Sequence, residues 1–125
     1  MAERLGQLQL QVMEVVWRLG RATVAQVHEA LAESRKIAYT TVLTTMRALE
    51  RRGVVRHEQV GKAYVYEPLV SRENYAASSV HRLVDDLFGG SREKLLCHLL
   101  GADRIGRSEL ASIRRMLRGG HGDKQ

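Results

Sequence analysis

Hydroxyl and guanidinium side chains recur along one side of residues 39–52, and both groups can bind nucleic-acid bases. On a helix with 3.6 residues per turn, Thr40, Thr44 and Arg47 fall on the same side. A threonine hydroxyl can hydrogen-bond to either kind of base edge, and an arginine can donate two hydrogen bonds to O6 and N7 of guanine. The spacing therefore favours a helix that reads the major groove of duplex DNA.

The opposite side of the same segment is apolar. Val42, Leu43, Met46 and Leu49 fall within a narrow arc of the helical wheel. A helix with one apolar and one polar side docks through the apolar one. We therefore expect the threonines and arginines to face outward.

Two helices should precede this segment. Apolar residues at helical spacing predict a first helix over about residues 6 to 19, ended by Gly20. Thr23 followed by Gln26 matches a capping box at the start of a second helix. The break at residues 34–37 then separates the second helix from the third, as in a helix-turn-helix.

A β-hairpin should follow the third helix. Gly53 fits a helix C-cap with positive φ, and residues 54–60 and 63–67 have the composition of strands. The turn would lie at residues 61–62, and Pro68 should stop the pairing. A hairpin placed after a helix-turn-helix is a wing, and its tip can lie on phosphates beside the groove.

These segments together predict a winged helix-turn-helix domain with one DNA-facing surface. The third helix supplies most of that surface, and the tip of the wing adds a lysine. We expect base contacts from Thr40, Thr44 and Arg47, and phosphate contacts from Tyr39, Thr41, Arg51, Arg52 and Lys62.

Amphipathic helices should fill the rest of the chain. A helix ended by glycines at 89–90 precedes two more, which Ser91 and Ser108 can cap. Three short helices without a sheet have little core of their own. We expect a second copy to cover their apolar stripes in a two-fold symmetric homodimer, the alternative being that they fold back on residues 1–70. The dimerisation residues would be Tyr75, Val80, Leu83, Val84, Leu87, Phe88, Leu95, Leu96, Leu99, Leu100, Leu110, Ile113 and Leu117.

The predicted fold class is mainly α with a small β-hairpin. We expect a winged helix-turn-helix DNA-binding domain over residues 1–70 and a three-helix dimerisation region over residues 71–118. Residues 119–125 contain three glycines and no apolar side chain, so we expect a disordered tail there.

Charge and composition narrow the class of protein. The chain has 125 residues and a formal net charge of +6, and residues 35–62 hold seven basic side chains against two acidic ones. Such focusing favours a polyanionic partner, although a merely soluble basic surface would look the same. The single Cys97 excludes a disulfide within one chain, and no apolar run approaches the ~18 residues of a membrane span. We expect a cytoplasmic protein without a membrane partner.

Catalytic and metal-binding interpretations are weaker. Cys97 and His98 are adjacent, and adjacent residues diverge on a helix, so one metal ion would need ligands from elsewhere. The carboxylates of Asp85 and Asp86 diverge for the same reason and have no suitably spaced partner. Residues 89–91 lack the lysine and the strand of a phosphate-binding loop. We therefore expect no enzyme activity, no metal and no cofactor.

Two other classes of function fit the same charge. An RNA-binding winged helix would tend to display stacking aromatic residues, and aromatic residues make up only 5% of the chain. A protein-interaction module would use the third helix to bind a protein partner, and its charge would be incidental. Salt-dependent binding to duplex DNA discriminates between the three.

Several stretches resemble the penicillinase repressor family of bacterial winged-helix regulators. They are Gln-Leu-Gln-Val-Met-Glu-Val-Val-Trp at 9–17, Ala-Tyr-Thr-Thr-Val-Leu-Thr-Thr-Met-Arg-Ala-Leu at 38–49, Gly-Val-Val at 53–55 and Tyr-Val-Tyr at 64–66. The resemblance implies a dimeric repressor that covers an inverted repeat at promoters and controls β-lactam resistance genes. It also implies a sensor protease as a partner, which triggers cleavage of the repressor in its C-terminal part.

The chain departs from the family's pattern at the cleavage site. That site looks like Asn-Phe in the family, whereas the only asparagine here is Asn74, which is followed by Tyr75. A copper-responsive branch of the family has clustered C-terminal cysteines, and Cys97 stands alone. The resemblance therefore carries over the fold and the DNA-binding surface, but not this cleavage site or a copper site.

Overall fold

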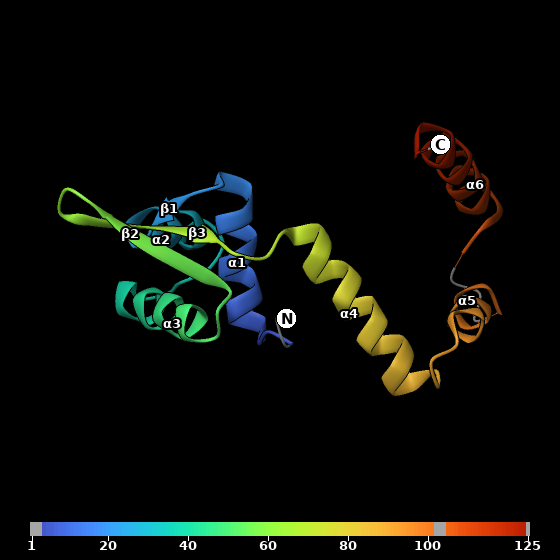
Figure 1. Cartoon of the computed structure of the whole chain (residues 1–125), viewed down its shortest axis with the longest axis horizontal. Helices are drawn as coiled ribbons and strands as arrows, with labels where there is room; N and C mark the ends of the chain where they lie inside the picture. The colour runs from blue at the N-terminus through green and yellow to red at the C-terminus, as the bar shows by residue number, and fades with distance from the viewer. Residues whose placement is uncertain (1–3, 102–104, 125) are drawn as a thin grey trace. The chain divides into compact units, whose positions relative to one another are not determined.

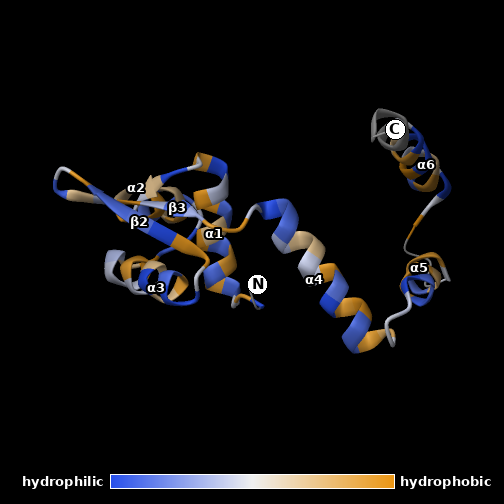
Figure 2. Ribbon diagram, in the orientation of Figure 1, coloured by the Kyte–Doolittle hydropathy of each residue, from blue (hydrophilic) through white to orange (hydrophobic). Residues whose placement is uncertain are grey.

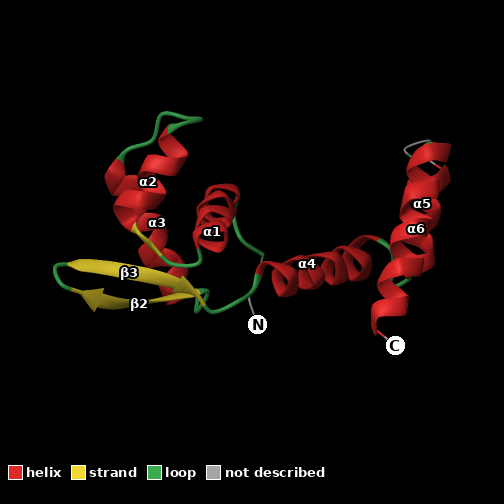
Figure 3. Cartoon of the chain, turned by 90° about the horizontal axis from the view of Figure 1, so that it is seen from above, coloured by secondary structure: helices red, strands yellow, loops and turns green. Residues whose placement is uncertain are grey.

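The computed structural model describes residues 4–101 and 105–124 (Figure 1). The chain divides into two compact units, Met1–Ser79 and Val80–Gln125, which we call the N-terminal and C-terminal units. The N-terminal unit has the order α1 (Gln7–Leu19), β1 (Ala22–Thr23), α2 (Val24–Ala32), α3 (Tyr39–Arg51), β2 (Val55–Val60) and β3 (Ala63–Pro68). Helix α4 (Arg72–Leu87) runs across the boundary, and α5 (Arg92–Gly101) and α6 (Arg107–Lys124) follow (Figure 3). The predicted fold class, mainly α with a small hairpin, is confirmed.

Local hydrogen bonds set the limits of α2 and α3. The Thr23 hydroxyl accepts from the backbone N–H of Gln26 at 3.1 Å, and the Gln26 side chain accepts from the backbone N–H of Thr23 at 2.8 Å. This reciprocal pair is the predicted capping box. At the end of α3, Gly53 has φ 78°, and the N–H groups of Gly53 and Val54 donate to the carbonyls of Glu50 and Leu49. These two bonds form a Schellman motif, which ends the helix and turns the chain into β2.

The hairpin belongs to a three-stranded sheet of order β1-β3-β2. Strand β1 is two residues long and pairs with Val65 and Tyr66 of β3, and it was not predicted from the sequence pattern. Pro68 was expected to stop the pairing, whereas it is the last residue of β3 and pairs with Val55. The physical reason is that β1 ends before it reaches Pro68. On that side of β3 there is no neighbouring strand to bond, so a proline without an N–H is tolerated there.

The core of the N-terminal unit lies between α1, α2, α3 and the sheet. Its largest fully buried side chains include Tyr66, Met13, Met46 and Leu49. Tyr75, from the first half of α4, completes this core. Its hydroxyl accepts from the backbone N–H of Leu5 at 2.9 Å, and its ring lies 5.9 Å from that of Trp17.

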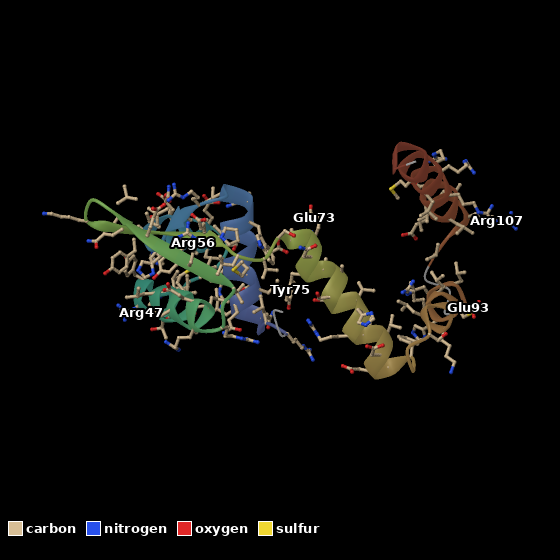
Figure 4. The ribbon with its side chains drawn as sticks, viewed as in Figure 1. Arg47, Arg56, Glu73, Tyr75, Glu93 and Arg107 are labelled. Atoms are coloured by element: carbon tan, nitrogen blue, oxygen red, sulfur yellow. The ribbon has the colours of Figure 1, made fainter. Side chains whose placement is uncertain are left out.

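The first half of α4 is therefore part of the N-terminal unit. We predicted a boundary between residues 70 and 71, whereas the compact units divide after Ser79. The sequence predicts one continuous apolar stripe along α4, but its first member, Tyr75, is only 8% exposed and packs within its own chain. Figure 4 labels Tyr75 at this end of α4.

The C-terminal unit consists of helical segments with alternating hydrophobic and hydrophilic residues (Figure 2). Ser91 caps α5 as expected, because its hydroxyl accepts from the N–H of Lys94 at 3.1 Å. Ser108 does not cap α6, because the helix already begins at Arg107. The first helical hydrogen bond is donated by the N–H of Leu110 to the backbone carbonyl of Gly106. None of the described helices is long and apolar enough to cross a membrane.

Helix α6 continues to Lys124, whereas we expected a disordered tail from residue 119. The expectation rests on the lack of apolar side chains that could pack there, and each glycine also costs a helix about 1 kcal/mol relative to alanine. Extending a helix that has already formed needs no new nucleation, so glycine does not have to end it. Gln125 lies outside the described residues.

Candidate nucleic-acid interface

Helix α3 has one buried and one exposed side, as its sequence predicted. Val42, Met46 and Leu49 have no exposed surface, whereas Thr44 and Arg47 are exposed. All the residues predicted to contact DNA are exposed. They are Tyr39, Thr40, Thr41, Thr44, Arg47, Arg51, Arg52 and Lys62. The structure therefore leaves this set of hydroxyl and basic groups on the surface of the N-terminal unit.

Thr45 is the threonine of this helix that faces inward. It is 8% exposed, and its hydroxyl donates to the backbone carbonyl of Thr41 at 2.8 Å. This internal bond satisfies the hydroxyl and explains how a polar side chain can lie against the core. The remaining threonines of α3, Thr40, Thr41 and Thr44, are exposed.

The start of α3 is held by a histidine from α2. His28 Nε2 donates to the backbone carbonyl of Ile37 at 2.8 Å, and the edge of the ring meets Tyr39 at a centroid distance of 5.8 Å. The N-cap residue, Ala38, supplies no side-chain hydrogen bond. The N–H of Thr41 donates to the backbone carbonyl of Ala38 at 3.1 Å, and no side chain caps the N–H groups ahead of it. A phosphate oxygen is an acceptor that suits such a helix N-terminus.

The hairpin presents two faces because side chains alternate along a strand. On the inner face, His57 of β2 lies opposite Tyr66, and Gln59 lies opposite Tyr64. His57 Nδ1 lies 2.7 and 2.8 Å from the two carboxylate oxygens of Glu50 on α3. This face therefore joins the wing to the third helix.

The outer face of the hairpin is an ion-pair network. Arg56 Nη2 lies 3.1 Å from Glu67 Oε2, and Arg21 pairs with both Glu58 and Glu67. The side chains are partly exposed, so the pairs add little stability. Their consequence is electrostatic, because the charge of Arg56, one of the seven basic residues between 35 and 62, is balanced by Glu67. Figure 4 labels Arg56 on β2, away from Arg47 on α3.

Arg52 has partners that its sequence position did not reveal. Its guanidinium donates to the Gln9 side chain at 2.7 Å and to the backbone carbonyl of Arg4 at 2.9 Å. These bonds tie the end of α3 to the start of α1. A DNA phosphate that binds Arg52 would have to share or displace these two hydrogen bonds. Lys62, by contrast, lies at the exposed turn of the hairpin.

The Glu50–His57 pair was missed by sequence reasoning. A signal was present, because Glu50 is the single acidic residue of an otherwise neutral and basic α3. Tyr66, beneath the pair, is 1% exposed, and burial followed by the charge of Glu50 raises the pKa of its hydroxyl. The inner face of the hairpin therefore holds a set of coupled polar groups rather than simple apolar packing.

The predicted dimerisation residues fall into three groups by exposure. Tyr75 and Val84 are buried, at 8% and 4% exposed. The half-buried group is Phe88, Leu95, Leu110 and Ile113. The exposed group is Val80, Leu83, Leu87, Leu96, Leu99, Leu100 and Leu117.

Groups that could hold a metal or do catalysis are dispersed. Cys97 is exposed, and Asp85 lies 3.3 Å from His81 on the same helix. Within the described ranges, no three histidine, cysteine or acidic side chains come together.

Comparisons with known proteins agree with this geometry. The chain matches the sequence model of the family described as penicillinase repressor over residues 5–119. It is 36% identical over 126 residues to the transcriptional regulator BlaI of Mycobacterium tuberculosis, covering 97% of this chain and 90% of that protein. It is 20% identical over 114 residues to the penicillinase repressor of Bacillus licheniformis, covering 91% and 89%.

A solved structure shares the fold of the N-terminal part. It is the monomeric form of Bacillus licheniformis BlaI in complex with the blaP half-operator, with a TM-score of 0.52 and 23% sequence identity. The match covers 60% of this chain and 92% of that one. The sequence match over nearly the whole length and the shared winged-helix fold confirm the resemblance: the chain belongs to the penicillinase repressor family, whose members are transcriptional regulators and not enzymes.

Proposed function

We propose that the chain is a dimeric, sequence-specific repressor that binds inverted-repeat promoter DNA, with a β-lactamase or related β-lactam resistance genes as its targets. The observation that carries the proposal is the two-sided α3, whose exposed threonines and arginines lie above fully buried Val42, Met46 and Leu49. A relative with the same fold is solved on a half-operator, which supports one half-site for each subunit. Bound over a promoter, the dimer blocks polymerase. Promoter DNA of a bacterium lies in the cytoplasm, and we place the protein there.

The contacts divide into those that read sequence and those that hold the protein on the duplex. Thr40, Thr44 and Arg47, on the outer side of α3, face bases in the major groove. Phosphate contacts come from both ends of the helix and from the tip of the wing. The phosphate-binding set is Tyr39, Thr41, Arg51, Arg52 and Lys62, with Arg52 also holding Gln9.

The C-terminal unit supplies the dimer. Leu87, Leu96 and Leu117 are 70%, 55% and 55% exposed in one chain, and a second copy offers an identical apolar surface to cover them. Two subunits joined in this way would bind half-sites about one helical turn, ~10 bp, or a multiple apart. Joining the subunits raises affinity through effective concentration, without any new DNA contact.

A sensor protease that released this repressor would cut somewhere other than the Asn74–Tyr75 bond. That bond lies inside α4, and the Tyr75 side chain is buried in the core of the N-terminal unit. A protease needs an extended, accessible segment, so cleavage there would first require local unfolding of the DNA-binding domain. We therefore place any regulatory cut within the C-terminal unit.

The test is selection of genomic fragments by the purified chain, followed by titration of the selected duplex at several salt concentrations. Arg47→Ala should cost about 1–3 kcal/mol of binding free energy and relax the preference at one base position. Lys62→Ala should lower the slope of log K against log salt by about one without changing the preference. Arg56→Ala is the matched control, because that arginine is already paired with Glu67.

Three outcomes would contradict the proposal. Absence of any duplex preference at low salt would exclude sequence-specific DNA binding. Tighter binding to RNA than to duplex DNA would favour the RNA-binding class. Equal weakening of all sequences by Arg47→Ala would make Arg47 a phosphate contact.

A further inference from the structure

Helix α3 carries one negative charge on a surface otherwise suited to a polyanion. Glu50 lies in the last turn of the helix, between Arg47 and Arg51, and its side chain is 32% exposed. A carboxylate is unfavourable near a helix C-terminus, because the carbonyl end of the helix dipole is negative. It would also repel the phosphates of a duplex bound to α3. Both costs fall if a cation is held beside it.

His57 is the group held beside it. Its Nδ1 lies 2.7 and 2.8 Å from the two oxygens of Glu50, and both side chains are 32% exposed. A carboxylate oxygen only accepts hydrogen bonds, so Nδ1 carries a proton and donates it. If Nε2 is protonated as well, His57 is an imidazolium and the pair has no net charge.

The imidazole is fixed by the strand next to its own. Its ring stacks on Tyr64 at a centroid distance of 4.4 Å and an interplanar angle of 28°, and it lies 5.3 Å from Tyr66. Tyr66 is buried and Tyr64 is 46% exposed near the tip of the hairpin. The ring therefore links α3 to β2 and β3 at one point, with Lys62 two residues before Tyr64.

The other charged groups near this point leave Glu50 as the counter-ion of His57. From α3, Arg47 and Tyr39 act electrostatically on the Tyr66 hydroxyl near the pair. From β3, the titratable groups that contact the His57 ring are Tyr64 and Tyr66. The neighbours of His57 on β2, Arg56 and Glu58, project to the outer face and pair with Glu67 and Arg21.

We propose that His57 is a positioning residue for DNA binding: in its protonated form it cancels the charge of Glu50, so that binding of duplex DNA takes up a proton at this site. The inference rests on the proposed function, since it concerns how the same surface meets DNA. The phosphates favour the imidazolium over the neutral ring. Affinity should therefore rise as the pH falls and His57 gains its second ring proton.

The experiment measures operator affinity and thermal stability for His57→Gln, Glu50→Gln and the double variant of the full chain. His57→Gln leaves an uncancelled carboxylate and should weaken binding about tenfold at pH 6.5. The double variant removes both charges and should recover most of the affinity, although the link between α3 and β2 is equally lost. Recovery separates charge cancellation from a general loss of folding, because a misfolded wing would not be rescued by a second substitution.

The pH profile supplies a readout that a purely structural role would not change. Wild-type affinity should increase as the pH falls, and the double variant should lose this dependence. His81→Gln is the matched control, because His81 is an exposed histidine of α4 with its own carboxylate partner, Asp85. NMR signals of the His57 ring should show a gain of protonation when the operator duplex is added.

The outcomes distinguish this inference from the function on which it rests. If the wild type binds no duplex, the proposed function fails. If the wild type binds but His57→Gln binds equally well, or the double variant is as weak as His57→Gln, the inference is overturned while DNA binding stands. A flat wild-type pH profile, or a pH dependence that persists in the double variant, also overturns it.

Discussion

The two units of the chain bury their apolar side chains to different extents. In the N-terminal unit the stripes of α1, α2 and α3 meet one another and the sheet, and residues such as Val16, Met46 and Leu49 have no exposed surface. In the C-terminal unit α5 contains no buried residue, and Leu87 is 70% exposed. Both regions have amphipathic helices, so an apolar stripe shows which side of a helix will be covered but not what covers it.

The difference predicts that the same substitution will act differently in the two units. Leu49→Ala should lower the free energy of unfolding by about 2–5 kcal/mol, because it leaves a cavity in a closed core. Leu96→Ala, at a side chain that is 55% exposed, should leave the unfolding of the N-terminal unit unchanged. Chemical denaturation followed by circular dichroism and by Trp17 fluorescence measures both. Equal losses would show that the two units share one core.

A charge on the open surface should separate the subunits. Leu87→Asp places a carboxylate in the predicted dimer interface, and operator affinity should fall on the order of 100-fold as the subunits bind independently. Analytical ultracentrifugation should show a monomer. Leu69→Asp is the control, since Leu69 is 53% exposed but lies in the N-terminal unit. A Leu87→Asp chain that stays dimeric would remove Leu87 from the interface.

The boundary between the units can be located by truncation. A chain that ends after Ser79 keeps Tyr75, whereas one that ends after Pro68 loses it together with the bond from its hydroxyl to Leu5. The longer fragment should be more stable by about 1–3 kcal/mol, and both should be monomers that bind DNA weakly. Tyr75→Ala in the longer fragment should remove the advantage. Identical thermal midpoints for the two fragments would restore the boundary near residue 70.

The smallest expected effect is a loss of stability at high pH that is confined to the N-terminal unit. Burial, with a further contribution from Glu50, raises the pKa of the Tyr66 hydroxyl above its usual 10.0. The folded chain thus holds this proton more tightly than the unfolded chain. Its contribution to stability is full below the unfolded pKa and is lost as the pH rises through the folded one. Tyr66→Phe should flatten this alkaline decline, and an unchanged decline would assign it to other groups.

The sequence predicted those parts of the fold that depend on local signals. The capping box at Thr23 and Gln26 and the positive φ of Gly53 are set within a few residues, and both were found where the pattern placed them. The short strand β1 was missed, because two residues carry no periodicity and pair only through the tertiary fold.

Interactions between distant segments were the harder part of the site. The exposure of Thr40, Thr44 and Arg47 follows from a helical wheel and is confirmed, whereas Leu43, predicted on the buried side, is half-buried. The partners of Arg52, the role of Tyr75 in the N-terminal core and the pairing of Glu50 with His57 each join elements that periodicity treats separately. The spacing of residues along a helix or strand identifies which of its faces is apolar. It does not show which faces of distant elements pack together, and these contacts depend on that packing.

The tight link between α3 and β2 restricts where this wing can vary in length. The Schellman bonds of Gly53 and Val54 leave no slack before β2, and Val54 is 1% exposed. Because side chains alternate along a strand, one residue inserted here would turn the hairpin inside out, so that Arg56 and Glu58 would face α3 where His57 now does. Lengthening at Gly61–Lys62 would leave that orientation intact, so changes in length among natural variants should collect at the outer turn.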